Sequence, residues 1–429
     1  MTRGDGIGAD AGAGTRAPRL SARDALAMYA ECSIHDLGAR AFEVAGRLHP
    51  EPYRTYVVDR NINYANWCTA KCAFCNFKAD PPGTKHGRKD LPGGYVLGFD
   101  EIGRKIRELL DIGGTQILMQ GGLVPPEILG FEWYLDLLRF IKREFPKIHV
   151  HAFSPPEVFA FHRVFGMPIR DVLLRLREAG LDSIPGGGAE ILVDRVRDRI
   201  SVGKTRTDEY LEVMRQAHRI GMRTSITMMF GHIETVAERI EHLQRVRDLQ
   251  DETGGFTAFI CWTFQPENTP LGRVKPMPAS SPIRQDPERE RRADMRMHLP
   301  DRHSQADVGA NPSVACDPDP DRNRPSGGSD GRHLCLAGAH EYLRTLALAR
   351  LFLDNIANVQ ASWVTQGPKI GQLALFFGAN DMGSVMMEEN VVSAAGTTYR
   401  LSENEIRRLI ADAGWEPRRR NFHYEIVEP

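Results

Sequence analysis

No apolar run in this sequence of 429 residues approaches the roughly 20 residues that a membrane-spanning helix requires. Net charge is nearly absent too, because 55 Lys and Arg residues offset 56 Asp and Glu residues. A chain without a basic excess lacks the long-range field that attracts nucleic acid or an anionic membrane. Residues 1–19 have neither the apolar centre of a signal peptide nor the Ser/Arg bias of a transit peptide. We therefore expect a cytoplasmic protein with no nucleic-acid or membrane partner.

Cysteine is scarce, with only 7 in the chain. Cys68, Cys72 and Cys75 nevertheless lie close together, whereas the others are scattered at positions 32, 261, 316 and 335. In the cytoplasm, clustered cysteines bind metal more often than they form disulfides. The cluster of three therefore predicts a metal site.

The hydrophobic pattern predicts an α/β fold. Strand-like segments at 56–62, 115–120, 148–153, 183–184, 223–230, 256–264 and 359–364 alternate with helical patterns such as 171–179, 207–220, 236–249 and 341–356. Repeated βα units predict a parallel sheet, and this number of them predicts a full or partial (β/α)8 TIM-type barrel. We also expect N-terminal helices within 21–48, and a C-terminal extension of one helix, capped by Ser402 with Glu405, and a polar strand at 421–427.

Domain boundaries follow from composition. Residues 1–19 predict a disordered tail, and residues 278–338 are rich in Pro, Asp, Arg, Ser and Gly, with no apolar period. Such a segment cannot bury enough surface to offset its ordering entropy, so it predicts a disordered insertion. One domain is then expected over 20–277 and 339–429.

The cysteine spacing, C-x3-C-x2-C, suits three corners of a [4Fe–4S] cluster whose fourth iron stays open. An open iron can bind the amino and carboxylate groups of S-adenosylmethionine (SAM), and Phe74 stands beside the last thiolate. Structural zinc is the alternative and would need a fourth ligand such as His86. An electron-carrying cluster would need a fourth cysteine, and Cys261 lies in an apolar strand.

The loop, with its Phe before the third cysteine, resembles the radical SAM superfamily. Further motifs follow in order: TQILMQGG at 115–122, HVHAFSPPE at 149–157, SIPGGGAE at 183–190, TMMFGH at 227–232, FQPENTP at 264–270 and QASWV at 360–364. Together they resemble the dehypoxanthine futalosine cyclase family of menaquinone biosynthesis. The resemblance covers residues from about 50 to 277 and from 339 to the end.

The resemblance implies a cyclisation. A 5′-deoxyadenosyl radical abstracts hydrogen from C4′ of dehypoxanthine futalosine, the carbon radical adds to the aromatic ring, and an electron and a proton leave. The cofactors would be a [4Fe–4S] cluster and SAM, with flavodoxin or ferredoxin as electron donor. Two related reactions remain alternatives, those of aminofutalosine synthase and of deazaflavin synthase. A non-enzymatic zinc or electron-transfer protein would leave the barrel and its glycine loops unexplained.

Site residues are expected where strands end, since barrel enzymes place their active sites at the C-terminal ends of their strands. The cluster ligands would be Cys68, Cys72 and Cys75. The cofactor-binding candidates are Phe74, Gln120, Gly121, Gly122, Ser154 and Glu190, and the candidates for proton transfer or substrate positioning are His151, Glu157 and His232. The run Gly186–Gly188 predicts a tight loop close to a ligand, which packing alone does not explain. For Trp363 two alternatives remain: its side chain lines the pocket, or it fills the inside of the barrel.

Overall fold

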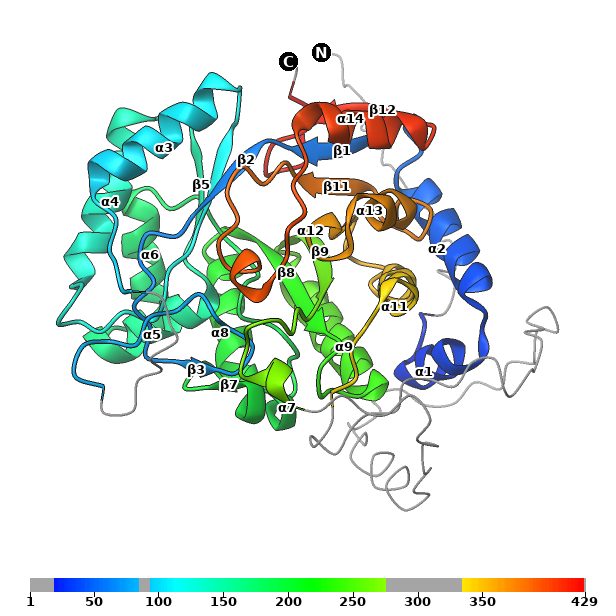
Figure 1. Ribbon diagram of the computed structural model, residues 1–429, viewed down its shortest axis with the longest axis horizontal. Coiled ribbons are helices and arrows are strands. Elements are labelled where there is room, and N and C mark those ends of the chain that lie inside the picture. The colour runs from blue at the N-terminus through cyan, green and yellow to red at the C-terminus, as the bar shows by residue number, and fades with distance from the viewer. Residues whose placement is uncertain (1–18, 85–92, 275–333, 428–429) are drawn as a thin grey trace, which may run out of the picture.

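A computed structural model of the protein describes residues 19–84, 93–274 and 334–427. A sheet of 10 strands, paired in parallel, forms its centre (Figure 1). The strands are β1 (Tyr53–Val57), β2 (Asp59–Ile62), β4 (Gln116–Met119), β5 (His149–Ala152), β6 (Ser183–Ile184), β8 (Arg223–Phe230), β9 (Phe256–Thr263), β10 (Asn358–Gln360), β11 (Asp381–Ser384) and β12 (Glu416–Arg419).

The sheet returns to its own start. Its order is β12-β1-β11-β10-β9-β8-β6-β5-β4-β2, and β1 and β2 are separated only by Val58. The carbonyl of Val57 accepts a hydrogen bond from Val385 on the β11 side, and that of Val58 accepts one from Thr115 on the β4 side. Residues 53–62 therefore contact the β11 side through β1 and the β4 side through β2, and the predicted fold, a full or partial (β/α)8-type barrel, is confirmed.

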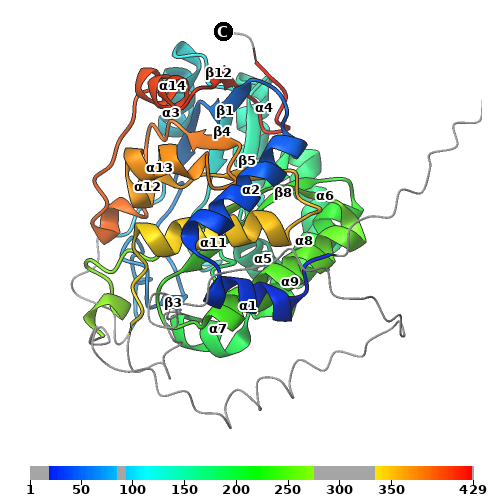
Figure 2. The same cartoon turned by 90° about the vertical axis from the view of Figure 1, so that its right-hand side faces the viewer.

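Most of the helices lie around the outer side of the sheet (Figure 1). They are α1 (Ala22–Glu31), α2 (Ile34–Leu48), α3 (Phe99–Asp111), α4 (Phe131–Glu144), α5 (Pro155–Phe165), α6 (Ile169–Ala179), α7 (Asp194–Ile200), α8 (Thr207–Arg219), α9 (Val236–Thr253), α11 (Ala339–Phe352), α12 (Trp363–Gln366), α13 (Pro368–Ala374) and α14 (Glu403–Asp412), with short 3-10 turns at Leu271–Arg273 and Ser393–Ala395. The N-terminal helices add a layer, in which α2 lies along α11 (Figure 2).

The helices form because their apolar residues recur on one face. In α3, Ile102, Ile106 and Leu109 are completely buried, at the spacing of three and four residues that places side chains on one side of a helix. The α14 helix begins with the predicted capping box, in which the Glu405 N–H donates to Ser402 Oγ over 3.3 Å and Glu405 accepts from the Ser402 N–H over 2.7 Å.

Two predicted strands differ from the structure. The strand expected at 359–364 ends at Gln360, and Trp363 begins α12 instead. The strand expected at 421–427 was misplaced: β12 occupies Glu416–Arg419, beside β1, and only one bridge, from Arg420 to Ile426, follows it. Strand β11 was missed because its four residues, Asp-Met-Gly-Ser, show no apolar run.

A few residues of the predicted disordered segments make contacts with the domain. Arg19, the last residue of the predicted tail, bonds to Asp251 over 2.6 Å and to Asp354 over 2.5 Å. Leu334 and Cys335, at the end of the predicted insertion, are buried, and the Cys335 N–H donates to the His232 carbonyl over 2.8 Å. Residues 1–18 and 278–333, Cys316 among them, lie outside the described residues, as does His86. Within the described chain, no helix has the length and apolar character needed to cross a membrane.

Candidate active site

The three clustered cysteines follow β2 directly, in a loop that is fixed at both ends. The Leu123 N–H donates to Cys68 Sγ over 3.3 Å, and the Cys68 N–H donates to the Ala79 carbonyl over 3.0 Å. Cys72 lies in β3 (Lys71–Cys72), which pairs antiparallel with β7 (Ser201–Val202). The loop is thus held from the end of β4 and from the segment after α7.

Gly121 and Gly122 allow the end of β4 to approach this loop. A Cβ atom on Gly122 would stand 2.1 Å from the Trp67 carbonyl oxygen, and one on Gly121 would stand 2.4 Å from the Tyr64 ring. Neither contact is possible, so both positions require glycine for packing alone. Their predicted contact with the cofactor is a separate matter and stays a prediction.

The chemistry of the loop fits an iron–sulfur cluster. Burial raises the pKa of the Cys68 and Cys72 thiols, so these thiols stay protonated until a metal displaces the proton. Among the described residues, no three His, Cys, Asp or Glu side chains converge on a single-ion site. In a cubane each cysteine binds a different iron atom, so three cysteines on one short loop suit a cluster with one open iron, whereas a structural zinc ion would need a fourth protein ligand.

A cavity of about 300 Å³ occupies the inside of the barrel. Among its lining residues are seven that the sequence singled out: Gln120, His151, Gly186, Gly187, Gly188, Glu190 and Trp363. Trp363 is 2% exposed and donates its Nε1–H to the Ser384 carbonyl over 3.1 Å, so it forms part of the cavity wall. Polar side chains from β2, β4 and β8 complete the wall: Asp59, Asn61, Gln116, Ser225 and Thr227.

Glu190 has the most informative environment. Its side chain is buried in the cavity wall, and Oε1 accepts a hydrogen bond from Lys204 Nζ over 3.0 Å. Oε2 lies 3.7 Å from Arg197 Nη1 and accepts no hydrogen bond. A buried carboxylate oxygen without a donor is costly, which points to a ligand that supplies one. The backbone is in the left-handed region, with φ 37°.

Lys204 connects this carboxylate to the cysteine loop. Its Nζ lies 5.4 Å from the centroid of the ring of Phe74, which directly precedes Cys75. Its charge also opposes the rise in the pKa of Cys72 that burial causes. Lys204 was not predicted as a site residue, because the β3–β7 pairing that brings it here joins distant segments: Cys72 pairs with Ser201, which comes 129 residues later.

Packing, contrary to the prediction, accounts for Gly186–Gly188. A Cβ atom on Gly186 would lie 2.6 Å from the backbone of Ile226, and one on Gly187 would lie 2.3 Å from Gln120 Nε2. Gly188 has a φ of 87°, which a larger residue rarely adopts. The loop does line the cavity, but packing against the β8 backbone requires glycine at Gly186 and backbone conformation favours it at Gly188, while Gly187 contacts only the movable end of the Gln120 side chain.

Glu157 lies outside the cavity. Its carboxylate is 1% exposed and accepts hydrogen bonds from Tyr64 Oη over 2.6 Å, from the Gly121 N–H over 3.0 Å, and from Ser154 N–H and Oγ over 2.8 and 2.6 Å. Ser154 is the N-cap of α5, so Glu157 closes a capping box and also holds the end of β4. Ser154 and Glu157 therefore hold the start of α5 and the end of β4 in place, and neither residue lines the cavity.

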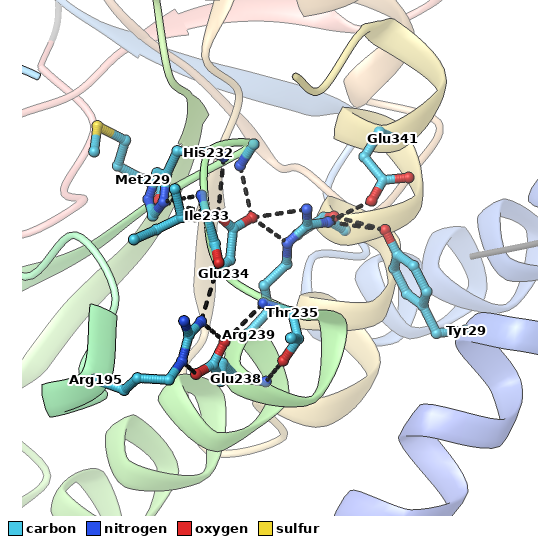
Figure 3. Close-up of polar contacts among 12 residues, drawn as sticks. Tyr29, Arg195, Met229, His232, Ile233, Glu234, Thr235, Glu238, Arg239 and Glu341 are labelled. Atoms are coloured by element: carbon cyan, nitrogen blue, oxygen red, sulfur yellow. Dashed lines mark hydrogen bonds and ion pairs between the residues drawn. The ribbon is translucent and has the colours of Figure 1, made fainter. Parts of the chain in front are cut away.

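His232 also lies outside the cavity, in the loop after β8 (Figure 3). Its Nδ1 lies 2.9 Å from Glu234 Oε2 and 2.8 Å from the Ile233 backbone nitrogen, and its Nε2 lies 3.1 Å from the Met229 carbonyl oxygen. Next to it, Glu234 bonds to Arg239, which reaches Glu341 of α11 over 2.5 Å. This network joins the β8 loop to the outer helices and leaves His232 no free nitrogen.

The C-terminal segment closes the N-terminal end of the barrel. Arg420 Nε and Nη2 donate to Asp381, the first residue of β11, over 2.6 and 2.9 Å. The Phe422 ring stacks on His149, the first residue of β5, with centroids 4.6 Å apart. Arg420, Phe422 and Tyr424 all line the cavity, so residues 420–424 form its floor.

A loop between β11 and α14 covers the opposite side. Met386, Glu389, Val391 and Val392 line the cavity, and Glu389 accepts hydrogen bonds from three backbone N–H groups of its own loop. The Ala394 carbonyl accepts from Asn76 Nδ2, next to Cys75, over 3.3 Å. The roof of the cavity therefore rests on the cysteine loop.

Two family models match the chain. Residues 62–246 match the radical SAM superfamily, and residues 333–429 match the CofH/MqnC C-terminal region. The first match contains the cysteine loop and the strand ends up to α9, and the second contains the floor and roof of the cavity.

Curated relatives cover nearly the whole chain. The cyclic dehypoxanthine futalosine synthase of Halalkalibacterium halodurans is 41% identical over 95% of this chain and 92% of its own, and that of Streptomyces coelicolor is 38% identical over 95% and 85%. A 5-amino-6-(D-ribitylamino)uracil–L-tyrosine 4-hydroxyphenyl transferase of Methanosarcina acetivorans is 35% identical over 87% and 82%. Among solved structures, methylornithine synthase shares the fold, with a TM-score of 0.60 at 16% identity over 94% of this chain and 95% of its own.

Proposed function

The chain belongs to the radical SAM superfamily, in the family of the cyclic dehypoxanthine futalosine synthases, and from this membership we propose that it cyclises dehypoxanthine futalosine for menaquinone biosynthesis. It is a radical SAM enzyme whose cofactors are a [4Fe–4S] cluster and SAM. The observation that carries the proposal is the continuity of the site. Phe74 of the cysteine loop, Lys204 and the unsatisfied carboxylate of Glu190 lead directly from the cluster ligands into the cavity.

Cys68, Cys72 and Cys75 would hold the cluster, and residues on the adjoining strand ends would hold SAM. When bound, these groups supply a 5′-deoxyadenosyl radical. Glu190 Oε2 would accept a hydrogen bond from the amine or ribose of SAM, which would supply the donor that this oxygen lacks. Gln120 lines the same wall, while Ser154 and Gly121 take part through the Glu157 hydrogen bonds that fix the end of β4.

The substrate occupies the barrel interior. A hydrogen atom is removed from C4′ of its sugar, a carbon–carbon bond forms to the aromatic ring, and an electron and a proton leave the ring. The electron passes to a one-electron carrier of the flavodoxin or ferredoxin type. The floor and roof described above keep bulk water from the carbon radical, and the barrel wall aligns C4′ with the ring.

His151 is the base that receives the proton. It is the only one of the three proposed proton-transfer residues that lines the cavity, among the residues that the structure describes. Burial lowers the pKa of its imidazole well below the ordinary value, so the ring is neutral near pH 7 and can accept a proton. We place the reaction in the cytoplasm, where the three thiols stay reduced.

A second reaction is a hydroxyphenyl transfer, because relatives with that activity are 35–37% identical over most of the chain. The higher identity to the cyclases favours cyclisation. The test is anaerobic reconstitution with iron and sulfide, then turnover with SAM, dithionite and dehypoxanthine futalosine, analysed by mass spectrometry. A product lighter than the substrate by two hydrogens supports the cyclase, provided that Cys72→Ala abolishes it. 5′-Deoxyadenosine released without that product would reject this substrate, and a parallel assay with L-tyrosine and the ribitylaminouracil would test the transferase.

A further inference from the structure

Three side chains at the foot of the barrel form a continuous hydrogen-bonded chain. His151 Nδ1 lies 2.7 Å from Ser183 Oγ, and the same hydroxyl oxygen lies 2.7 Å from His149 Nε2. His149 and His151 point to one side of β5, since they are two residues apart, and His151 is the register partner of Ser183 on β6. One hydroxyl therefore links two imidazoles.

This chain leads from the cavity towards the outside. His151 lines the cavity and Ser183 is completely buried, whereas His149 is half-buried. The His149 ring stacks on Phe422 of the floor and meets the exposed His423 edge-on, with ring centroids 5.6 Å apart. The three groups thus cross the floor that otherwise separates the cavity from the N-terminal end of the barrel.

The hydrogen bonds are compatible with one direction of proton movement. With the proton of His151 on Nδ1, that N–H donates to Ser183 Oγ, and the Ser183 hydroxyl donates to His149 Nε2. His151 Nε2 then presents its lone pair in the cavity wall, 3.4 Å from Ser225 Oγ. Ser225 Oγ accepts from the Gly186 N–H over 3.0 Å, so its own hydrogen can donate to Nε2 at rest, over a long contact, and turns away when Nε2 receives a proton.

We propose that His151, Ser183 and His149 form a proton relay that carries the proton released on ring closure out through the floor of the barrel. The inference rests on the proposed cyclisation. The C–H bond at the newly bonded ring carbon breaks, and its proton goes to His151 Nε2. The Nδ1 proton of His151 moves to Ser183 Oγ, the hydroxyl proton moves to His149 Nε2, and the Nδ1 proton of His149 goes to water. The electron pair of the C–H bond stays in the ring, and the unpaired electron leaves to the one-electron carrier.

His151 is thereby a catalytic residue, and Ser183 and His149 are relay residues that never contact the substrate. The relay also gives a reason for two histidines on one strand, because one of them receives the proton and the other releases it. A histidine that only held the substrate would not need the second ring behind it.

The test compares two products of the same turnover. In reconstituted holoenzyme, Ser183→Ala and His149→Gln should still release 5′-deoxyadenosine within about threefold of the parent rate, because hydrogen abstraction precedes proton release. Cyclised product per 5′-deoxyadenosine should fall by about tenfold or more, the scale of a lost general base. Ser183→Thr keeps the hydroxyl and should restore the ratio, which loss of packing alone would not explain.

A matched control is available in His218→Gln. His218 is also buried and bonded to two hydroxyls, those of Thr253 and Thr224, over 2.6 and 2.8 Å, but it lies outside the cavity. Its substitution should leave the product ratio at the parent value. An unchanged ratio in Ser183→Ala, with cyclised product present in the parent, would overturn the relay and leave the proposed function intact.

Absence of cyclised product from the parent enzyme would instead reject the proposed function. The relay can then still be tested by NMR spectroscopy. In ¹⁵N-histidine NMR of the substrate-free holoenzyme, His151 and His149 should both carry the proton on Nδ1, and Ser183→Ala should shift both ring signals. A proton on His151 Nε2 would overturn the relay whatever the substrate is, because no lone pair would then face the cavity.

Discussion

At the scale of single residues, Glu157 and Glu190 show how the same side chain serves two purposes. Glu157 has donors for both oxygens, while one oxygen of Glu190 has none. A satisfied buried carboxylate stabilises the fold, and an unsatisfied one in a cavity wall awaits a ligand. The sequence alone does not separate the two cases, because both glutamates follow a strand end at similar spacing.

Glu190→Gln should weaken SAM binding. The amide keeps the shape of the side chain but removes the negative charge, and a hydrogen bond to a charged group contributes about 1.5–3 kcal/mol, which corresponds to roughly a tenfold or greater rise in Kd. Equilibrium binding of SAM to the reconstituted protein measures this. Glu178→Gln, on the exposed side of α6, is the control and should bind as the parent does. Equal Kd values for both variants would remove Glu190 from the SAM site.

Glu157→Ala should destabilise the fold. It leaves the Gly121 N–H, the Ser154 N–H and Tyr64 Oη in a buried space without their acceptor, which costs about 3 kcal/mol or more. Urea unfolding monitored by circular dichroism measures the loss, and Glu157→Gln, which keeps one acceptor oxygen, should lose less. Parent-like stability combined with lost turnover would contradict this structural role and restore Glu157 as a base.

At the scale of elements, long periodic segments were predictable and short ones were not. Strand β8 and helix α8 begin where the sequence predicts, because eight or more residues carry their period. Strand β11, at Asp381–Ser384, has four residues without an apolar run, so only its place between β10 and β1 makes it a strand. The β3–β7 pair, which positions Lys204, likewise depends on tertiary contacts that no local pattern records.

Part of the candidate site could be predicted from short sequence motifs. His151, Gln120 and Glu190 were predicted and line the cavity, whereas Glu157 and His232 do not, and the predicted role of the three cysteines stays a prediction. Asp59 and Asn61 were missed, because Arg60 between them is polar as well and hides the alternation that places Asp59 and Asn61 on the side of β2 that faces the cavity. The floor residues 420–424 follow the last strand, and nothing in their sequence shows that they return to the barrel.

Packing between β4 and the cysteine loop leads to a prediction about cluster assembly. Gly122→Ala would push the loop from the β4 end, because its Cβ would stand 2.1 Å from the Trp67 carbonyl. The parent should bind about four irons per chain after anaerobic reconstitution, and this variant should bind less than half of that. Gly130→Ala is the control, since its Cβ would meet nothing within 4 Å and its φ of −74° suits alanine. Full iron loading in Gly122→Ala would show that the loop tolerates displacement.

At the scale of the whole molecule, the barrel is closed by residues far apart in the chain. Thr55 of β1 donates to Asp381 of β11 over 2.6 Å, and Arg420 bonds to the same carboxylate. The first strand, the last barrel strand and the C-terminal floor therefore meet at one carboxylate. The chain needs both of its ends to complete one cavity, which is why the two matched family regions act as one unit.

Arg420→Met should destabilise the protein by about 3–5 kcal/mol, because it leaves the Asp381 carboxylate, which is 0% exposed, without its cation. Asp381→Asn should also destabilise it, but the double variant should recover part of the sum, since it removes both charges and leaves none buried alone. Urea unfolding of the four proteins gives the coupling energy between the two sites. Strictly additive losses would mean that the pair does not connect the floor to β11. Strong coupling, together with a higher yield of 5′-deoxyadenosine per cyclised product in Arg420→Met, would show that the ion pair both closes the barrel and protects the radical from water.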